Sequence, residues 1–371
     1  MSGSAATAKA TAAQATARRK DHHLDICLDP ERYRVQSTIT TGFEQLRFVH
    51  EALPEIDGGA VDSSQAFLGD RLALPMLISC MTGGSGRGRT ANRLLAAAAQ
   101  QAGIAVGLGS MRPLVEDDQL LDHFHVKPLA PDVPVLANIG AAEVRRLAAH
   151  DLVELTRRLE AQALVVHLNP GQELFQPEGD HDFRGQLDAI QRLVEEAAQG
   201  EALPVMVKET GFGIRPRRAR QLLASGVAYV DVAGAGGTNW VLVEGYRLPQ
   251  AAAAAAAAMA DWGLPTAVAV AALRDCGDRV IASGGIRDGV TVAKAVALGA
   301  RLGALALPFI RDVVEGGVDE VLEQVETLAT AFRATMALVG AADVAALRRC
   351  PLLRTAEFDR QVSQLADLDG G

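Results

Sequence analysis

Two glycine-rich segments in the second half of the chain have the composition of phosphate-binding loops. Each follows a short apolar run: the first is Gly234-Ala235-Gly236-Gly237-Thr238, and the second is Ser283-Gly284-Gly285-Ile286-Arg287-Asp288-Gly289. Because glycine has no Cβ, backbone N–H groups in such a loop can approach an anion at the start of a helix. A plain turn that uses glycine for its conformation is the alternative for each segment. Their position after apolar runs favours phosphate binding.

Lys208 closes another apolar run, Val205 to Val207. An ammonium group that is removed from water must have an anionic partner or lose its proton. The anionic N1–C2=O edge of a reduced flavin is one such partner, and a carbonyl substrate that forms a Schiff base is another. A structural ion pair with Glu209 or Asp231 is the alternative.

A third cluster joins an imidazole, amides and a carboxylate in one loop, His167-Leu168-Asn169-Pro170-Gly171-Gln172-Glu173. A lone histidine is more often structural, but several hydrogen-bonding groups in one loop favour function. Glu173 is a candidate Mg²⁺ ligand, because magnesium sites combine one or two carboxylates with water and phosphate oxygens of the substrate.

A short basic run, Arg18-Arg19-Lys20-Asp21-His22-His23, lies near the start of the chain. Such a run is usually a solvated face. Beside a ligand site it could instead clamp a second phosphate group, the diphosphate of a substrate, with arginine giving bidentate contacts and lysine a point charge.

These clusters must be positioned by the elements that precede them. Eight short apolar runs each end in a polar or glycine-containing loop, and they are Leu74–Cys80, Ile104–Leu108, Val133–Ala137, Ala163–Val166, Val205–Val207, Val227–Val232, Val280–Ala282 and Ala304–Leu307. Stretches of helical period separate them, among them Thr90–Ala102, Val144–Ala161, Gly185–Ala198, Arg217–Ser225 and Val290–Leu298. Eight strand-loop-helix units predict an α/β fold, a (β/α)8 TIM barrel.

A doubly wound sheet shares this alternation of strands and helices. However, nearly all the polar clusters follow a strand, and only a barrel brings the ends of all its strands to one site. The glycine segment at Ser283, together with the eighth strand end at Leu305–Pro308, matches the phosphate site that barrels place after strands 7 and 8. We therefore predict an N-terminal arm over residues 19–72 that contributes to the substrate site, and a barrel with a C-terminal helical extension over 73–371.

Composition, net charge and cysteine spacing limit the fold classes and the kinds of binding partner to be expected. Hydrophobic residues make up 49% of the chain and aromatic residues only 4%, as in cores of parallel sheets covered by helices. The formal net charge of −9 argues against nucleic acid and against anionic membranes. The four cysteines, Cys27, Cys80, Cys276 and Cys350, show no CxxC spacing, so we expect reduced thiols and a cytoplasmic protein.

No apolar run is long enough to cross a membrane, and the octa-alanine Ala251–Ala258 predicts a helix. Residues 1–18 are rich in Ala, Thr and Ser, with no acidic residue and no apolar segment of a secretory signal. We predict that they form a disordered tail, although a transit peptide shares this composition.

Taken together, these clusters resemble the type 2, FMN-dependent isopentenyl-diphosphate isomerases, from about Arg19 to the C-terminal region. The matching strings are Arg19-Lys20-Asp21, Met81-Thr82-Gly83-Gly84, Gly107-Leu108-Gly109-Ser110, His167-Leu168-Asn169-Pro170 with Gln172-Glu173, Val207-Lys208-Glu209 with Gly211 and Gly213, Gly234 to Thr238 with Trp240, Asp261-Trp262-Gly263 with Pro265-Thr266, and Ser283 to Arg287. Any one string could arise by chance, but the ordered set is specific.

The resemblance implies a barrel that holds FMN across its mouth and stacks a small-molecule diphosphate substrate on the flavin. It implies an FMN site formed by Met81, Thr82, Ser110, Asn138, Lys208, Thr238, Gly284, Gly285 and Arg287. It assigns the substrate to Arg19, Lys20, Arg112, His167, Asn169 and Gln172, and Mg²⁺ to Glu173. Trp240 and Glu244 would lie near the reacting end of the substrate, with N5 of reduced FMN as acid and base, and NADPH would be needed only to reduce the flavin. Members of this family are usually homotetramers or larger, so the resemblance also implies a homo-oligomer.

Three positions depart from the family pattern: His22 stands for its usual Glu, Met111 for a common Gln, and Asn239 for its usual Ser. The rival functions are an FMN-dependent 2-hydroxyacid oxidase or dehydrogenase and a non-catalytic flavin-binding protein. The oxidase needs a histidine and an arginine late in the barrel, as base and carboxylate clamp, and the loop Gly234–Thr238 offers no such histidine. A non-catalytic protein would have no use for ligands of a diphosphate and a metal.

Overall fold

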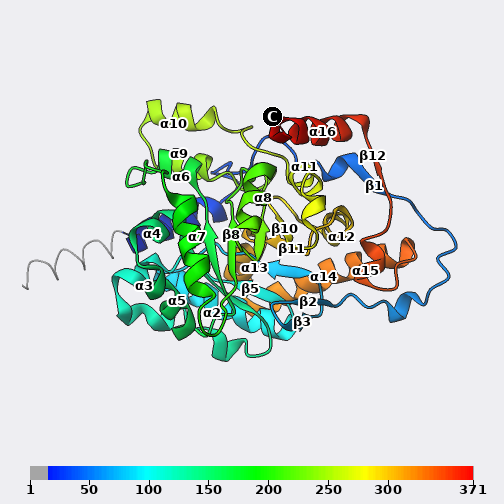
Figure 1. Cartoon of the computed structure of the whole chain (residues 1–371), viewed down its shortest axis with the longest axis horizontal. Coiled ribbons are helices and arrows are strands. Elements are labelled where there is room, and N and C mark those ends of the chain that lie inside the picture. Colours follow the sequence, from blue (N-terminus) through cyan, green and yellow to red (C-terminus); the bar gives the residue numbers. More distant parts are fainter. Residues whose placement is uncertain (1–15, 371) are drawn as a thin grey trace, which may run out of the picture.

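Eight parallel strands form a closed barrel in the computed structural model, which describes residues 16–370 (Figure 1). The strand order around the barrel is β10-β11-β4-β5-β6-β7-β8-β9. The strands span β4 Met76–Ile78, β5 Ala105–Gly107, β6 Val135–Gly140, β7 Ala163–His167, β8 Val205–Lys208, β9 Tyr229–Asp231, β10 Val280–Ser283 and β11 Leu302–Leu305. The predicted (β/α)8 fold is confirmed.

Alternation of side chains along the strands divides the core into two layers. One cluster fills the inside of the barrel with small and branched side chains such as Leu77, Ala105 and Val165. Phe67 belongs to this inner cluster and packs against Tyr229 at the start of β9, with ring centroids 5.1 Å apart. Phe67 lies on the hairpin of β2 (Gln65–Phe67) and β3 (Asp70–Leu72), so this hairpin closes the end of the barrel where the strands begin.

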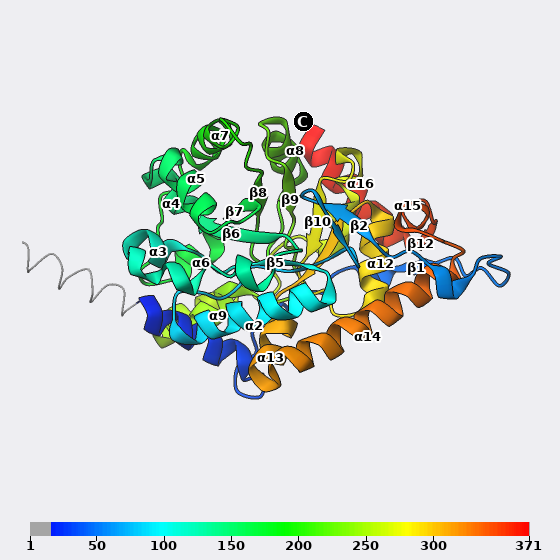
Figure 2. The ribbon, with the colours of Figure 1, turned by 90° about the horizontal axis from the view of Figure 1, so that it is seen from below.

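Helices surround the strands, as Figure 2 shows for α2, α5, α7, α8 and α12. These helices span α2 Gly86–Ala102, α5 Ala149–Arg158, α7 Gln186–Ala197, α8 Pro216–Ala224 and α12 Gly289–Leu298. Their buried faces pack on the outer side of the strands in a second, larger cluster. Side chains cap several helix starts: Ser85 accepts a hydrogen bond from Gly88 N at α2, and Asp288 accepts one from Thr291 N at α12.

Shorter helices lie in the connections and in the C-terminal part. They are α3 Arg112–Glu116, η3 Asp118–His123, η4 Lys127–Leu129, α4 Ala141–Arg146, α6 Pro170–Phe175, α9 Trp240–Gly245, α10 Gln250–Ala257, α11 Thr266–Ala271, η5 Arg274–Cys276, α13 Leu307–Glu315 and α15 Val344–Leu347. The alanine run forms α10, as predicted. Two longer helices, α14 Gly317–Leu338 and α16 Ala356–Gly370, complete the chain.

Several predicted boundaries differ from those of the structure, and two of these differences change an element. The helix expected over 144–161 is two helices, α4 and α5, because Leu147 and Ala148 have extended backbone angles. The last barrel strand runs from Leu302 to Leu305, and Leu307 already begins α13.

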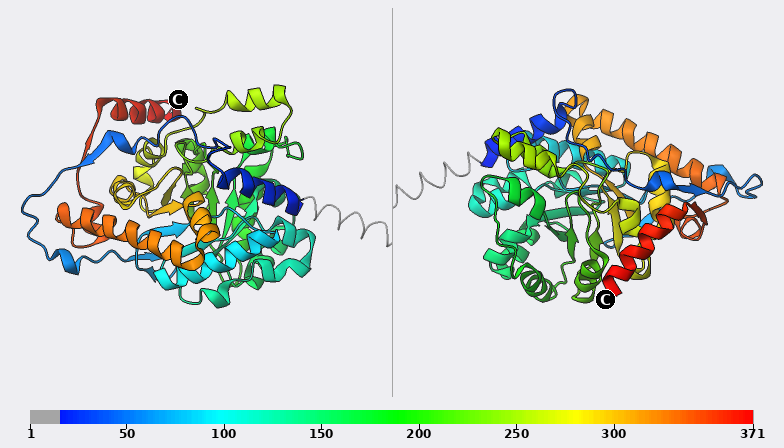
Figure 3. Two further views of the ribbon diagram at one scale, coloured as in Figure 1. Left: turned by 180° about the vertical axis from the view of Figure 1, so that it is seen from behind. Right: turned by 90° about the horizontal axis from the view of Figure 1, so that it is seen from above.

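The arm that precedes the barrel runs along its whole side (Figure 3). It contains a helix over residues 16–28, then η1 Phe43–Gln45, β1 Leu46–Phe48 and η2 Gly58–Ala60, and it ends in the β2–β3 hairpin. Strand β1 pairs antiparallel with β12 (Leu352–Arg354), which ties the arm to the C-terminal part. Of the predicted tail, residues 1–15 lie outside the described residues, and 16–18 are helical. Over residues 16–370, no helix is long and apolar enough to cross a membrane.

Candidate active site

Two adjoining cavities open at the end of the barrel where the strands finish. We call the first the glycine cavity; it is lined by loops after β8 to β11, including Lys208, Thr238, Gly284, Gly285 and Arg287. We call the second the basic cavity; it is lined by Arg19, Lys20, Arg112, Asn138, Glu143, His167, Asn169, Gln172 and Glu173. Cys80, Met81, Lys208, Thr210 and Trp240 line both cavities, so the two spaces share a wall.

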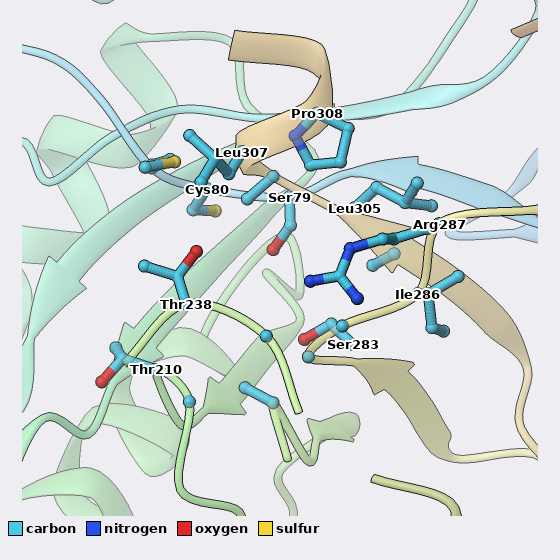
Figure 4. A pocket seen from close by; sticks show the side chains of 18 of the residues that line it. Ser79, Cys80, Thr210, Thr238, Ser283, Ile286, Arg287, Leu305, Leu307 and Pro308 are labelled. Atoms are coloured by element: carbon cyan, nitrogen blue, oxygen red, sulfur yellow. The ribbon is translucent and has the colours of Figure 1, made fainter. Parts of the chain in front are cut away.

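Backbone packing shapes the glycine cavity. Gly284 and Gly285 have φ angles of +97° and +76°, in the left-handed region that favours glycine. A Cβ on Gly284 would lie 2.0 Å from the carbonyl oxygen of Gly234, so the loops after β9 and β10 touch through their backbones. Figure 4 shows the Arg287 guanidinium extending into the space between Ser79, Ser283 and Thr238. A backbone cradle with one arginine suits a phosphate group.

Lys208 ends β8 at the wall between the cavities. Its side chain is buried, and its ammonium group donates a hydrogen bond to the carbonyl oxygen of Glu209 at 2.7 Å. Asp231 is its register partner on β9 and accepts hydrogen bonds from Ser283 Oγ at 2.6 Å and Ala233 N at 3.2 Å. Burial raises the pKa of Asp231, against the lowering effect of Lys208. Lys208 thus donates to the backbone carbonyl of Glu209 and not to the carboxylate of Glu209 or Asp231, the two partners of the alternative ion pair. Its ammonium charge is therefore available to a ligand.

The cationic side chains of Arg19, Lys20 and Arg112 line the basic cavity. Lys20 donates to the carbonyl oxygen of Ser110 at 3.0 Å, and Arg112 lies 3.4 Å from Glu143 and 3.1 Å from Glu116. Burial, followed by the charges of Arg19 and Arg112, lowers the pKa of Lys20 to about 7. Burial and Arg112 likewise lower the pKa of Arg19, whose buried Nε has no hydrogen-bond partner. The cavity therefore has a deficit of negative charge that a diphosphate would fill.

His167 is held in its neutral form. Burial, then Lys208 and Lys20, lower its pKa to about 3. Its Nδ1 lies 3.0 Å from Asn138 Oδ1, while Asn138 Nδ2 is buried without a partner. Both groups line the basic cavity, so they can hydrogen-bond a ligand without adding charge.

Glu173 presents its carboxylate near Asn169 and the start of the following loop. It accepts hydrogen bonds from Asn169 Nδ2 at 3.0 Å and from Asp180 N at 2.7 Å. Within residues 16–370, no group of three or more His, Cys, Asp or Glu side chains could hold a metal. A cation at Glu173 would therefore take most of its ligands from the substrate and water, as Mg²⁺ commonly does.

Glu244 lies behind the cavities and is fully buried. It accepts a hydrogen bond from Gln172 Nε2 at 3.0 Å, lies 2.9 Å from His23 Nε2 and pairs with Arg247. Burial would raise the pKa of Glu244, but His23, Gln172 and Arg247 together hold it below its usual value. Trp240 packs against the His23 ring edge to face, with centroids 5.5 Å apart. Glu244 thus reaches the basic cavity through Gln172.

The buried carboxylate of Glu209 organises the loop after β8. Glu209 Oε2 accepts hydrogen bonds from the backbone N–H groups of residues 210 to 213, at 2.5–3.1 Å. Burial raises the pKa of Glu209 to about 7, against the lowering effect of these donors and of Lys208. Since Thr210 and Gly211 line the glycine cavity, Glu209 fixes part of its wall.

Nearly all the predicted site residues meet at this mouth. The residues predicted for FMN, substrate and metal line the two cavities, except that Thr82 lines a small adjoining space with Lys20, His23 and Trp240. Residues that the sequence did not indicate also contribute, among them Gln36, Ser79, Glu143, Thr210 and Arg311. Gln36 carries no sequence signal, because the arm reaches the loops only in the folded chain.

The three departures from the family pattern lie outside the cavities. His22 is exposed, while Met111 is buried in the core and donates its backbone N–H to Asn138 O. Asn239 is buried and caps α9 by accepting hydrogen bonds from Val241 N and Leu242 N. None of the three residues lines either cavity.

Comparison with known proteins first defines a class. The family of FMN-dependent dehydrogenases matches residues 140–354, more than half of the chain. Among solved structures, a mandelate oxidase covers 90% of this chain and 99% of its own length, at a TM-score of 0.61 and 18% identity. A flavocytochrome b2 covers 88% and 82%, at a TM-score of 0.65 and 18% identity. At these identities the structures show the shared barrel fold alone.

Relatives of higher identity define the family more narrowly. The isopentenyl-diphosphate delta-isomerase of Xanthobacter autotrophicus is 46% identical over 341 residues, which cover 90% of this chain and 97% of the relative. The proteins of the same name from Stutzerimonas stutzeri and Pyrococcus abyssi are 45% and 38% identical, covering 92% and 95% of this chain and 98% and 96% of their own lengths. The chain belongs to the isopentenyl-diphosphate delta-isomerase family.

Proposed function

We propose that this protein interconverts isopentenyl diphosphate and dimethylallyl diphosphate, a reversible 1,3-proton shift in isoprenoid biosynthesis. The observation that carries the proposal is the shared wall of the two cavities. One cavity has the glycine cradle and arginine that suit a flavin phosphate, and the other has the cations that suit a diphosphate. Membership of the isomerase family supports this assignment of the two spaces.

The glycine cavity fits FMN. Gly284, Gly285, Thr238 and Arg287 would hold the phosphate end, and Met81 and Lys208 at the shared wall would hold the flavin ring. Ser110 and Asn138 in the basic cavity and Thr82 in the small adjoining space would contact the ring from the other side of this wall. Reduced FMN, once bound, supplies an acid and base at N5, and NADPH serves to reduce it. The ammonium of Lys208, buried at the shared wall, would balance the negative charge of the reduced ring.

The basic cavity fits the substrate. Arg19, Lys20 and Arg112 would bind the diphosphate, while His167, Asn169 and Gln172 would line the space around it. Glu173 would hold Mg²⁺ against the phosphate oxygens. Trp240 lines both cavities, so its ring would cover the apolar end of the substrate and exclude water there. Glu244, whose pKa is held low, would stay ionised and fix the Gln172 side chain by accepting its hydrogen bond.

The geometry does not favour a hydroxyacid oxidase. Among the residues that line the two cavities, the histidines are His23, from the arm, and His167, from β7. His23 is engaged with Glu244. The loop after β9, which would need a base, contributes glycines and Thr238. Assembly as a homotetramer or larger and a cytoplasmic location remain predictions.

An isotope experiment tests the proposal. With its flavin reduced beforehand under anaerobic conditions, the protein should interconvert the two diphosphates over many turnovers without consuming further NADPH. In D2O, deuterium should enter C4 as dimethylallyl diphosphate forms, and the reverse reaction should label C2 of isopentenyl diphosphate. Proton nuclear magnetic resonance follows both positions. No deuterium with the reduced protein, together with flavin reduction by lactate or glycolate, would assign an oxidase instead.

A further inference from the structure

Part of the arm lies across the glycine loops. Gln36 forms an antiparallel bridge with Thr238, the N–H of Ser37 donates to Gly237 O at 2.8 Å, and the N–H of Asn239 donates to Val35 O at 2.8 Å. Residues 35–37 therefore extend the loop after β9 as a short extra strand would. This contact joins the arm to the loop that carries Thr238.

A second contact fixes the arm a few residues further on. Thr41 lies so close to Gly236 and Gly285 that a Cβ at either glycine would be 2.5 Å from its nearest Thr41 atom. The carbonyl oxygen of Thr41 also accepts a hydrogen bond from Ala267 N at 2.9 Å. The segment between the two contacts is thus held at both ends against the glycine loops.

The Gln36 side chain reaches from this segment to Arg287. Its Oε1 accepts a hydrogen bond from Arg287 Nη2 at 2.5 Å, and both residues line the glycine cavity. A guanidinium has five N–H donors in a fixed fork, so one bond to Gln36 leaves others for a phosphate. An amide oxygen carries no net charge, so it orients the arginine without neutralising it.

We propose that Gln36 is a positioning residue that holds Arg287 toward the phosphate of the cofactor and makes the protein select FMN over riboflavin. The inference rests on the proposed function, since it requires FMN in the glycine cavity. Selection would follow because Arg287 would contact the phosphate, the one group that riboflavin lacks. A carboxylate at position 36 would instead pair with Arg287 and repel the phosphate.

The test measures flavin affinity of the full-length protein after its flavin is removed. Gln36→Glu and Gln36→Ala are titrated with FMN and with riboflavin, following quenching of flavin fluorescence. Gln65→Glu makes the same change of charge on strand β2, in the hairpin that closes the opposite end of the barrel. Gln65 is therefore the matched control, with wild-type affinity expected for both flavins.

Gln36→Glu should weaken FMN binding by about 10-fold or more, the size expected for a lost charge-assisted contact, and leave riboflavin affinity within about 3-fold. Gln36→Ala should weaken FMN binding less, because Arg287 keeps its charge. Equal losses for both flavins would mean a structural role and overturn the inference, as would unchanged affinities. If the wild-type protein binds neither flavin, the proposed cofactor itself is wrong.

Discussion

At the scale of single residues, the buried ammonium of Lys208 is the feature with the clearest consequence. Its hydrogen bond to Glu209 O satisfies one donor but supplies no negative charge. Lys208→Ala should therefore purify with much less FMN, because loss of one partner from a buried charged contact costs about 3–5 kcal/mol. The ratio of flavin to protein absorbance, and the Kd for FMN, measure the effect.

Lys127→Ala is a matched control for this change. Lys127 also donates to a backbone carbonyl, Val133 O at 3.0 Å, but it lies where the chain enters β6, at the far end of the barrel from the cavities. It should retain wild-type flavin content. Full occupancy and full activity in Lys208→Ala would remove Lys208 from the cofactor site.

Two carboxylates of the basic cavity compete for the role of metal ligand. Glu173→Gln should lower activity and raise the Mg²⁺ concentration needed for half-maximal rate, because the amide keeps the shape but loses the charge. Glu143 is already paired with Arg112 and Arg146, so Glu143→Gln should leave the Mg²⁺ requirement closer to wild type. Titrating the rate with Mg²⁺ at fixed substrate separates the two. The reverse order would move the metal to Glu143.

The lowered pKa of Lys20 predicts that substrate binding is coupled to proton uptake. Burial lowers its pKa to about 7, so the free protein carries this charge below pH 7 and loses it as pH rises. A bound diphosphate restores the charge, so binding at pH 8 should take up a proton, whereas binding at pH 6 should take up little. Titration calorimetry with inorganic pyrophosphate in two buffers of different ionisation heat measures this uptake. Lys20→Met should abolish it, and equal uptake in wild type and Lys20→Met would exclude Lys20 as the source.

At the scale of elements, the residue that caps the start of α12 should affect both the stability of the helix and the glycine cavity beside it. Asp288 accepts hydrogen bonds from Thr291 N at 2.7 Å and from Thr291 Oγ1 at 2.8 Å, directly after Arg287. Asp288→Ala should lower the free energy of unfolding by about 0.5–2 kcal/mol, as loss of an N-cap does, and should weaken FMN binding as the loop loosens. Urea unfolding and FMN titration measure the two effects.

Asp343 provides the comparison, because it caps α15 in the C-terminal part by accepting from Ala346 N at 2.6 Å. Asp343→Ala should lose similar stability and keep wild-type FMN affinity. If both variants lose flavin equally, the effect follows from general destabilisation and not from the loop.

Strands and helices could be predicted where the local sequence pattern alone determines them. Val205–Lys208 and Val280–Ser283 are apolar runs closed by a polar residue, and both are strands that end at the mouth. Strand β6 runs three residues further than predicted, through Asn138, because its pairing with β7 continues to Gly140. The longer β6 depends on its pairing with the neighbouring strand β7, which the sequence of β6 alone does not indicate. The break between α4 and α5 was missed for a similar reason, since Leu147 and Ala148 contain no glycine or proline to mark it.

At the scale of the whole molecule, the barrel and most of its site could be predicted, whereas the arm could not. The site residues follow strands, and the closure of the barrel brings them together without further information. Gln36 and Thr41 reach the glycine loops across some 200 residues of sequence, through a backbone bridge and close packing that no local pattern around either residue indicates. No spacing or residue type signals such an approach.

The pairing of β1 with β12 also affects when β1 can fold during translation. Leu46–Phe48 leaves the ribosome roughly 300 residues before Leu352–Arg354, its partner. At about 5–20 residues per second, the interval is on the order of 15–60 s. Throughout it the whole barrel is synthesised while β1 has no strand to pair with, so β1 reaches its final place only after translation is nearly complete. Gln36 and Thr41 belong to the same arm but contact segments that end at Arg287, so the phosphate end of the glycine cavity can form before β12 has been made.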